Sequence, residues 1–142
     1  MPEKVRRHFL KDREATQLLN AFSNKLKIDV KQLLGSKQSL ESIETPTGTI
    51  FSIDKKPLIA IINGELVPTL LFEEALRFLP KIVVNMGAVP HICNGADVMA
   101  PGVVRIEKDF DTDDYVVVTD ERYNKPIAIT VALIGSKKAR DQ

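Results

Sequence analysis

A change of hydrophobic period near Gly35 constrains the fold more than any other feature of this sequence. Before it, from Val5 to Ile28, apolar residues recur at helical spacing: Phe9, Leu10, Ala15, Leu18, Leu19, Phe22 and Leu26. This 3.6-residue period predicts one amphipathic helix that begins near Asp12, after a basic segment. A second, shorter helix is expected over residues 29–34, where Gly35 ends it.

After Gly35, apolar and polar residues alternate, which predicts short antiparallel strands. Strands are expected over 39–44 and 49–54, joined by a turn that contains Pro46 and Gly48. A strand over 58–62 is followed by Asn63-Gly64, a strong hairpin signal because both residues tolerate a positive φ, and by a returning strand over 65–68. A helix over 70–79 should end at Pro80. The first 79 residues therefore read as a small α+β domain.

From Lys81 onward the pattern is one of short strands, expected over 81–84, 98–100, 103–106, 115–119 and 127–134. One short helical segment over 87–94 must begin close to Pro90, which has no N–H to donate. Several short strands with a single short helix predict a small barrel or sandwich. The expected fold class is thus α+β, with one domain at 1–79 and a second, β-barrel domain at 80–142.

The composition excludes several classes of protein. Of 142 residues, 44% are hydrophobic and 27% charged, which is typical of a folded chain rather than a disordered one. The longest apolar stretches, such as Leu58 to Ile62, are far shorter than the ~20 residues of a membrane helix. No apolar core follows the N-terminal charges, so we expect no signal peptide. The chain is therefore expected to be a soluble cytoplasmic protein. Cys93 is the sole cysteine, which excludes an internal disulfide and a multi-cysteine zinc site.

The distribution of charge says more than the net charge of +1. Residues 1–31 contain eight lysines and arginines against four acidic residues, whereas residues 107–121 contain seven acidic residues against one lysine. Lys137, Lys138 and Arg140 make the end of the chain basic again. Such separated charges could orient a polyanion, and they are equally compatible with ordinary solvated surfaces.

Small residues recur in a defined pattern between Lys81 and Val103. A strand is followed by Asn85 before Gly87-Ala88, then by a helix, then by Gly95-Ala96-Asp97 and Pro101-Gly102. This pattern resembles the opening of a PUA domain, a module of archaeosine transglycosylases, pseudouridine synthases and translation factors. The resemblance implies an RNA-binding β-barrel, in which the groove between the helix and the second strand receives double-stranded RNA.

The residue types in this pattern suit such a groove. Gly87-Ala88 and Gly95-Ala96 would let an RNA backbone approach closely and would expose N–H groups at a helix start, although glycine and proline can also serve only to shape turns. Double-stranded RNA is recognised mainly by shape, phosphates and 2′-hydroxyls, and phosphate contacts make binding weaken steeply with salt. The predicted RNA-binding residues are Lys81, Asn85, Gly87, Ala88, Asn94, Gly95, Ala96, Asp97, Pro101, Gly102, Arg105, Lys125, Lys137 and Lys138.

The start of the chain, Arg6 to Glu14, resembles archaeal PUA proteins related to the malignant T-cell-amplified-sequence translation proteins. These have a pre-PUA domain before the barrel, and their eukaryotic relatives act on the small ribosomal subunit in initiation, reinitiation and recycling. The resemblance implies structured RNA, either tRNA or rRNA, as the ligand, and the small ribosomal subunit or a translation factor as a further partner. The sequence departs from the pattern in the acidic run after Glu107, which must face away from RNA, and in Pro90, where a basic residue could contact phosphate.

Other motifs point to chemistry less specifically. Asp109-x-Asp111-x-Asp113 is similar to a calcium loop, but Asp114 stands where glycine is needed and Asp120 where glutamate is. His91 and Cys93 are close in sequence, yet no third residue orients the histidine, and Cys93 is expected to be buried. Neither a metal nor a cofactor is expected.

The preferred function is therefore non-catalytic RNA binding, in translation or RNA modification. The alternative is a protein-interaction module that docks on a translation factor or an RNA-modifying enzyme.

Overall fold

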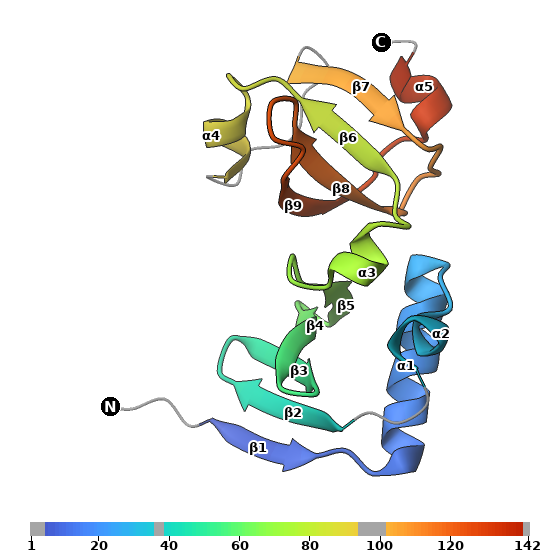
Figure 1. Cartoon of the computed structure of the whole chain (residues 1–142), viewed down its shortest axis with the longest axis vertical. Helices are drawn as coiled ribbons and strands as arrows, with labels where there is room; N and C mark the ends of the chain where they lie inside the picture. Colours follow the sequence, from blue (N-terminus) through green and yellow to red (C-terminus); the bar gives the residue numbers. More distant parts are fainter. Residues whose placement is uncertain (1–4, 36–38, 94–101, 141–142) are drawn as a thin grey trace. The chain divides into compact units, whose positions relative to one another are not determined.

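The computed structural model describes residues 5–35, 39–93 and 102–140. The chain divides into two compact units, Met1–Arg77 and Phe78–Gln142. The first contains a five-stranded sheet with helices, and the second a four-stranded sheet with short helices (Figure 1). The predicted α+β class is confirmed.

The sheet of the first unit is antiparallel and follows the order of the chain. Its strands are β1 (Arg6–Phe9), β2 (Leu40–Thr45), β3 (Gly48–Ile53), β4 (Lys56–Ile62) and β5 (Glu65–Pro68). Asn63 and Gly64 join β4 to β5 with φ angles of 53° and 79°, as the predicted hairpin requires. The alternating pattern thus predicted the strands from Leu40 onward correctly.

Three helices belong to this unit within the described residues: α1 (Asp12–Leu26), α2 (Val30–Leu34) and α3 (Glu73–Leu76). The Lys11 N–H donates to Glu14 Oε1 at 3.1 Å where α1 begins. The Gly35 N–H donates to the Lys31 carbonyl at 3.0 Å where α2 ends, so the predicted stop is confirmed. Phe22 of α1 is fully buried and stacks on Phe72, with ring centroids 6.2 Å apart.

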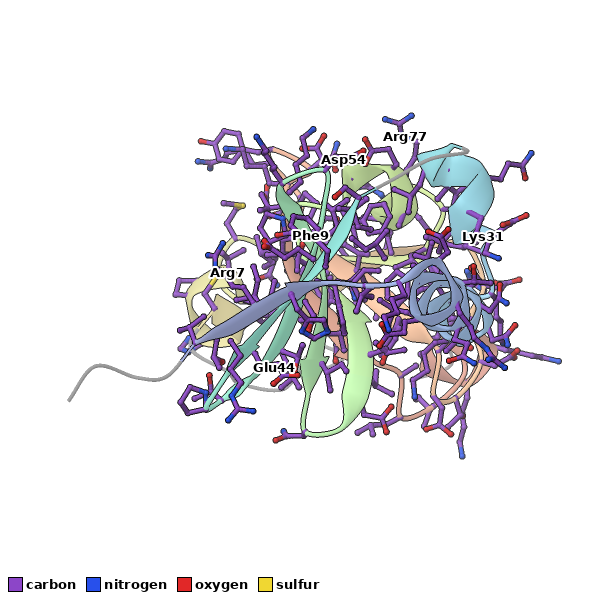
Figure 2. All side chains as sticks on the ribbon, turned by 90° about the horizontal axis from the view of Figure 1, so that it is seen from below. Arg7, Phe9, Lys31, Glu44, Asp54 and Arg77 are labelled. Carbon is purple, nitrogen blue, oxygen red and sulfur yellow. The ribbon has the colours of Figure 1, made fainter. Side chains whose placement is uncertain are left out.

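Two predictions for this unit are wrong. Phe9, which was expected on the helical stripe, lies in β1, where it faces Glu41 of β2 and is 66% exposed (Figure 2). Hydrogen bonding to a strand some thirty residues away decides the conformation of β1, and a local period cannot reveal it. The helix expected over 70–79 shrinks to α3, because Thr69 holds a tight turn before it: its carbonyl accepts the Phe72 N–H at 3.1 Å.

The sheet of the second unit has the order β7-β6-β8-β9, with β6 and β8 parallel and the other pairs antiparallel. The strands are β6 (Lys81–Val84), β7 (Val103–Glu107), β8 (Tyr115–Asp120) and β9 (Pro126–Val131). Residues of β8 are buried along its whole length, which suits its run of valines in a central strand. The predicted small β domain is confirmed. In the described residues β7 and β9 form the two edges of this sheet, so the expected closed barrel is not seen.

Two short helices complete the second unit in its described part, α4 (Val89–Cys93) and α5 (Ser136–Arg140). Pro90 is the second residue of α4, as its missing N–H predicted. Helix α5 was not predicted, because tertiary contacts hold it: Ser136 Oγ accepts the Phe110 N–H at 3.0 Å, and Arg140 Nη1 donates to Asp109 Oδ1 at 2.6 Å. No helix in the described ranges is long and apolar enough to cross a bilayer.

Candidate nucleic-acid interface

The loop after β6 brings several predicted residues together. The Asn85 N–H donates to the Gly102 carbonyl at 2.9 Å, and Asn85 Oδ1 accepts the Ala88 N–H at the same distance. A Cβ atom on Gly102 would lie 3.2 Å from the Ala88 Cβ, and one on Gly87 would lie 3.3 Å from Asn85 Oδ1. These small residues therefore allow two chain segments to approach closely at the carboxyl end of β6.

The N–H groups at the start of α4 are largely used inside this loop. The Ala88 N–H also donates to the Asn85 carbonyl at 3.1 Å, and the Val89 N–H donates to the Met86 carbonyl at 3.4 Å. The expectation of exposed donors is therefore wrong for Ala88 and Val89. Here the small residues shape the loop. Because their side chains are short, a ligand could approach the backbone of this loop closely.

The turn between β8 and β9 lies beside this loop, because parallel strands end at the same edge of a sheet. The Glu121 N–H donates to the Val84 carbonyl at 3.0 Å, and the Met86 N–H donates to Glu121 Oε1 at 3.3 Å. Lys125, a predicted RNA-binding residue, ends the same turn and is exposed. We call residues 85–88, Gly102 and residues 121–125 together the Asn85 surface.

Asp120 holds this turn in place. Its side chain is buried, and its carboxylate accepts the N–H of Tyr123 and, at 3.3 Å, the N–H of Lys125. The backbone hydrogen bond from Tyr123 is the largest cause of a pKa for Asp120 that lies below the ordinary value, while burial acts in the opposite direction. The turn is thus built around a buried, hydrogen-bonded carboxylate.

Arg122 and Tyr123 also lie on the Asn85 surface, and neither is among the residues predicted from the sequence. Tyr123 is 63% exposed, and the Arg122 guanidinium carbon lies 6.0 Å from the centre of its ring. The available signal was a basic residue next to an aromatic one in a turn between two predicted strands. That combination is typical of surfaces that stack nucleobases.

Other predicted residues lie at the opposite end of this sheet. Lys81 begins β6 and pairs with Glu107, while Lys137 and Lys138 are exposed on α5. The Ser136 N–H donates to the Phe110 carbonyl at 2.8 Å, which anchors α5 near the amino end of β8. Figure 1 shows α4 and α5 at opposite ends of the sheet.

The remaining predicted residues fall into two groups. Arg105 lies within β7, exposed, and its Nε atom is 3.2 Å from Glu107 Oε1, so part of its charge is neutralised. The others lie outside the described residues: Asn94, Gly95, Ala96, Asp97 and Pro101.

Of the acidic residues after Glu107, those from Asp109 to Asp114 lie away from the Asn85 surface, before the amino end of β8, whereas Glu121 is part of that surface and Asp120 is buried beneath its turn. Asp109 Oδ1 accepts from Arg140 at 2.6 Å, and this contact holds the pKa of Asp109 below its ordinary value. Asp114 Oδ2 accepts the Asp111 N–H at 2.8 Å. In the part of the chain that the structure describes, no group of three His, Cys, Asp or Glu side chains is placed to hold a metal ion.

His91 and Cys93 lie on α4 on either side of Ile92. Ile92 packs with Val84 and Val118, which leaves both neighbours exposed. The prediction that Cys93 is buried is therefore wrong, because Val89 and Ile92 are the residues of this short helix that pack against the core.

Comparison with known proteins identifies both parts of the chain. The PUA domain model matches residues 80–141, and the model of the domain of unknown function DUF1947 matches residues 6–73. An uncharacterized protein of Methanocaldococcus jannaschii is 34% identical over 116 residues, which cover 80% of this chain and 70% of the relative. The crystal structure of a hypothetical protein from Pyrococcus horikoshii aligns with a TM-score of 0.78 and 30% identity, and covers 96% of this chain and 87% of that one.

Two further relatives have functional names. Translation machinery-associated protein 20 of Schizosaccharomyces pombe is 26% identical over 132 residues, 88% of this chain and 72% of that protein. A probable tRNA pseudouridine synthase B of Pyrobaculum aerophilum is 41% identical over 68 residues, but the match covers 48% of this chain and only 20% of the enzyme. The predicted family resemblance is confirmed. This chain belongs to the PUA-domain proteins that have a DUF1947 domain on the amino-terminal side of the PUA domain.

Proposed function

We propose that this protein binds structured RNA through the Asn85 surface and catalyses no reaction. The observation that supports the proposal most is the meeting of three separate segments, 85–88, Gly102 and 121–125, at one end of the sheet. This end combines a closely packed loop of small residues with the basic side chains of Arg122 and Lys125. PUA domains are generally RNA-binding.

The proposal assigns affinity mainly to shape and backbone contacts. The acidic residues from Asp109 to Asp114 lie at the other end of the sheet, Arg122 and Lys125 are the basic residues of the Asn85 surface, and Arg105 lies on the adjacent strand β7, opposite Val83. Three phosphate contacts would give a dependence of log affinity on log salt with a slope of about −3. Double-stranded RNA suits a surface with few phosphate contacts, because proteins recognise its wide, shallow minor groove by shape and by 2′-hydroxyl contacts.

The relatives suggest which RNA and which process. One is named for the translation machinery, and another is a probable tRNA pseudouridine synthase that matches this chain over a fifth of its own length. We therefore propose tRNA or rRNA as the ligand, in translation or RNA modification, with the small ribosomal subunit or a translation factor as a partner in the cytoplasm. The limited overlap with the enzyme supports a non-catalytic role.

A filter-binding titration with tRNA and with ribosomal RNA fragments at several salt concentrations tests the proposal. Lys125→Ala should weaken binding and reduce the salt slope by about one. Lys137→Ala and Lys138→Ala serve as matched controls, because they remove the same charge at the far end of the sheet. Absence of binding at micromolar protein, or equal losses from all three variants, would contradict the proposed surface.

A second candidate function is protein interaction through the first unit. A cavity of about 530 Å³ lies there among α2, the β3–β4 turn and the segment before α3, with Leu33, Leu34 and Leu71 in its lining. Leu71 is 63% exposed, so this cavity presents apolar surface to solvent. The absorbance ratio at 260 and 280 nm of protein purified at low salt separates the two functions, since bound RNA raises it and a protein partner does not.

A further inference from the structure

We propose that Tyr123 and Arg122 form a stacking platform for one unpaired nucleobase of the bound RNA. This inference rests on the proposed RNA-binding function and narrows its ligand to structured RNA in which a duplex adjoins an unpaired nucleotide. Neither residue belongs to the pattern of small residues that predicted the groove.

The first argument is the way in which the aromatic ring is presented. Tyr123 is 63% exposed and the Arg122 guanidinium lies 6.0 Å from the ring centre, so neither side chain is held there by core packing. A cation over an aromatic face is attracted to it, and both planar groups are surfaces on which nucleobases stack. A single exposed tyrosine is ordinary on a protein surface, and three further features distinguish this one: the guanidinium beside it, the rigidity of its turn and its location.

The second argument is the rigidity of the turn. The Asp120 carboxylate, only 4% exposed, accepts the backbone N–H groups of Tyr123 and Lys125, and the Asp120 carbonyl accepts the Asn124 N–H at 3.2 Å. Asn124 adopts a left-handed conformation with φ of 54°, which asparagine tolerates well. A ring on a fixed backbone loses little conformational entropy when a base stacks on it.

The third argument is location. Glu121, at the start of the turn, is hydrogen-bonded both to Val84 and to the Met86 N–H, which places the platform at the edge of the loop that contains Asn85. Lys125 lies at the end of the same turn and can reach a phosphate. Within a duplex both faces of each base are covered by neighbours, so the exposed face of Tyr123 can receive only an unpaired or terminal base.

The test compares three RNA hairpins that share one stem: a blunt one, one with a 3′ single-stranded extension and one with a 5′ extension. The extensions contain 2-aminopurine, whose fluorescence is quenched by stacking. Full-length wild-type protein should bind one extended hairpin about 10-fold more tightly than the blunt one, with quenching, since one stacked base contributes on that order. Tyr123→Ala should abolish the preference and the quenching, whereas Tyr123→Phe should keep both.

Two controls isolate stacking from charge and from general surface changes. Leu133→Ala truncates another exposed apolar side chain, 83% exposed and distant from the turn along β9, and should keep the preference. Tyr123→Ala should leave the salt slope unchanged, because stacking releases no counterions. Binding of blunt and extended hairpins with equal affinity, or a preference that survives Tyr123→Ala, would overturn the platform while leaving the RNA-binding proposal intact. Failure to bind all three hairpins would refute the RNA-binding proposal itself, and the platform with it.

Discussion

At the scale of single residues, Gly48 shows why the first position of β3 allows no side chain. A Cβ atom there would lie 2.6 Å from the Ile61 carbonyl oxygen of the neighbouring strand. The Thr45 hydroxyl donates to the Gly48 carbonyl at 2.9 Å and fixes the same backbone. The glycine is therefore required by the close approach of β4.

Gly48→Ala should lower the free energy of unfolding by about 1–3 kcal/mol, because a backbone oxygen cannot move aside as a flexible side chain can. Urea unfolding followed by circular dichroism measures the change. Asn20→Ala, on the exposed face of α1, is the control and should stay within about 0.5 kcal/mol of wild type. Equal stability of the two variants would show that no such close approach exists.

Asp120 makes the stability of the second unit depend on pH. A carboxyl group whose pKa is lower in the folded than in the unfolded chain stabilises the fold fully above its ordinary pKa of 3.8, and this stabilisation is lost as the pH falls toward the folded value. Asp120→Asn should thus destabilise the protein more at pH 7 than at pH 3. Urea midpoints at both pH values measure this, with Asp113→Asn as a control for net charge; a difference that is the same at both pH values would contradict the role of Asp120.

At the scale of elements, local signals predicted those whose stabilising contacts are close in sequence. Helix α1 has its apolar stripe within fifteen residues, and the Asn63-Gly64 hairpin pairs adjacent strands. By contrast, β1 is paired with a strand beyond two helices, and α5 is held by Ser136 and Arg140 contacts to the segment 109–110. These two elements depend on partners that are distant in the sequence, and the hydrophobic period of a segment does not reveal such partners.

Helix α1 should depend on Phe22 far more than β1 depends on Phe9. Phe22 is fully buried against Phe72, whereas Phe9 is 66% exposed. Phe22→Ala should therefore lower the free energy of unfolding by about 3–5 kcal/mol, and Phe9→Ala by less than about 1 kcal/mol. Thermal and urea unfolding of both variants provide the comparison. Similar losses of unfolding free energy would mean that the apolar stripe of α1 is not the main contact between this helix and the rest of the unit.

At the scale of the whole molecule, the division into Met1–Arg77 and Phe78–Gln142 suggests two units that fold separately. We propose domains close to residues 1–79 and 80–142. The second unit has its own buried clusters, one around Val84 and Val118 and another around Phe110 and Val116. A domain of this small size is marginally stable, so a separate core is a strict requirement for independent folding.

A fragment of residues 78–142 should fold alone and bind RNA within a few-fold of the full chain. Its amide spectrum should be dispersed, and the signals of β6 and β8 should match those of the intact protein. A folded fragment that loses most of its affinity would instead assign part of the RNA contact to the first unit. An unfolded fragment would show that the two units depend on each other for stability.

The sequence alone determined the family, the α+β class, the main helix, the hairpins and the pattern of small residues around Gly87 and Gly102, because all of these are local in the chain. Tertiary structure alone decided which predicted residues share a surface. The parallel pairing of β6 with β8 brings Asn85 beside Lys125 and adds Arg122 and Tyr123, while it leaves Lys137 at the opposite end. Strand pairing joins residues that are far apart in the chain, and hydrophobic periodicity contains no information about such partners.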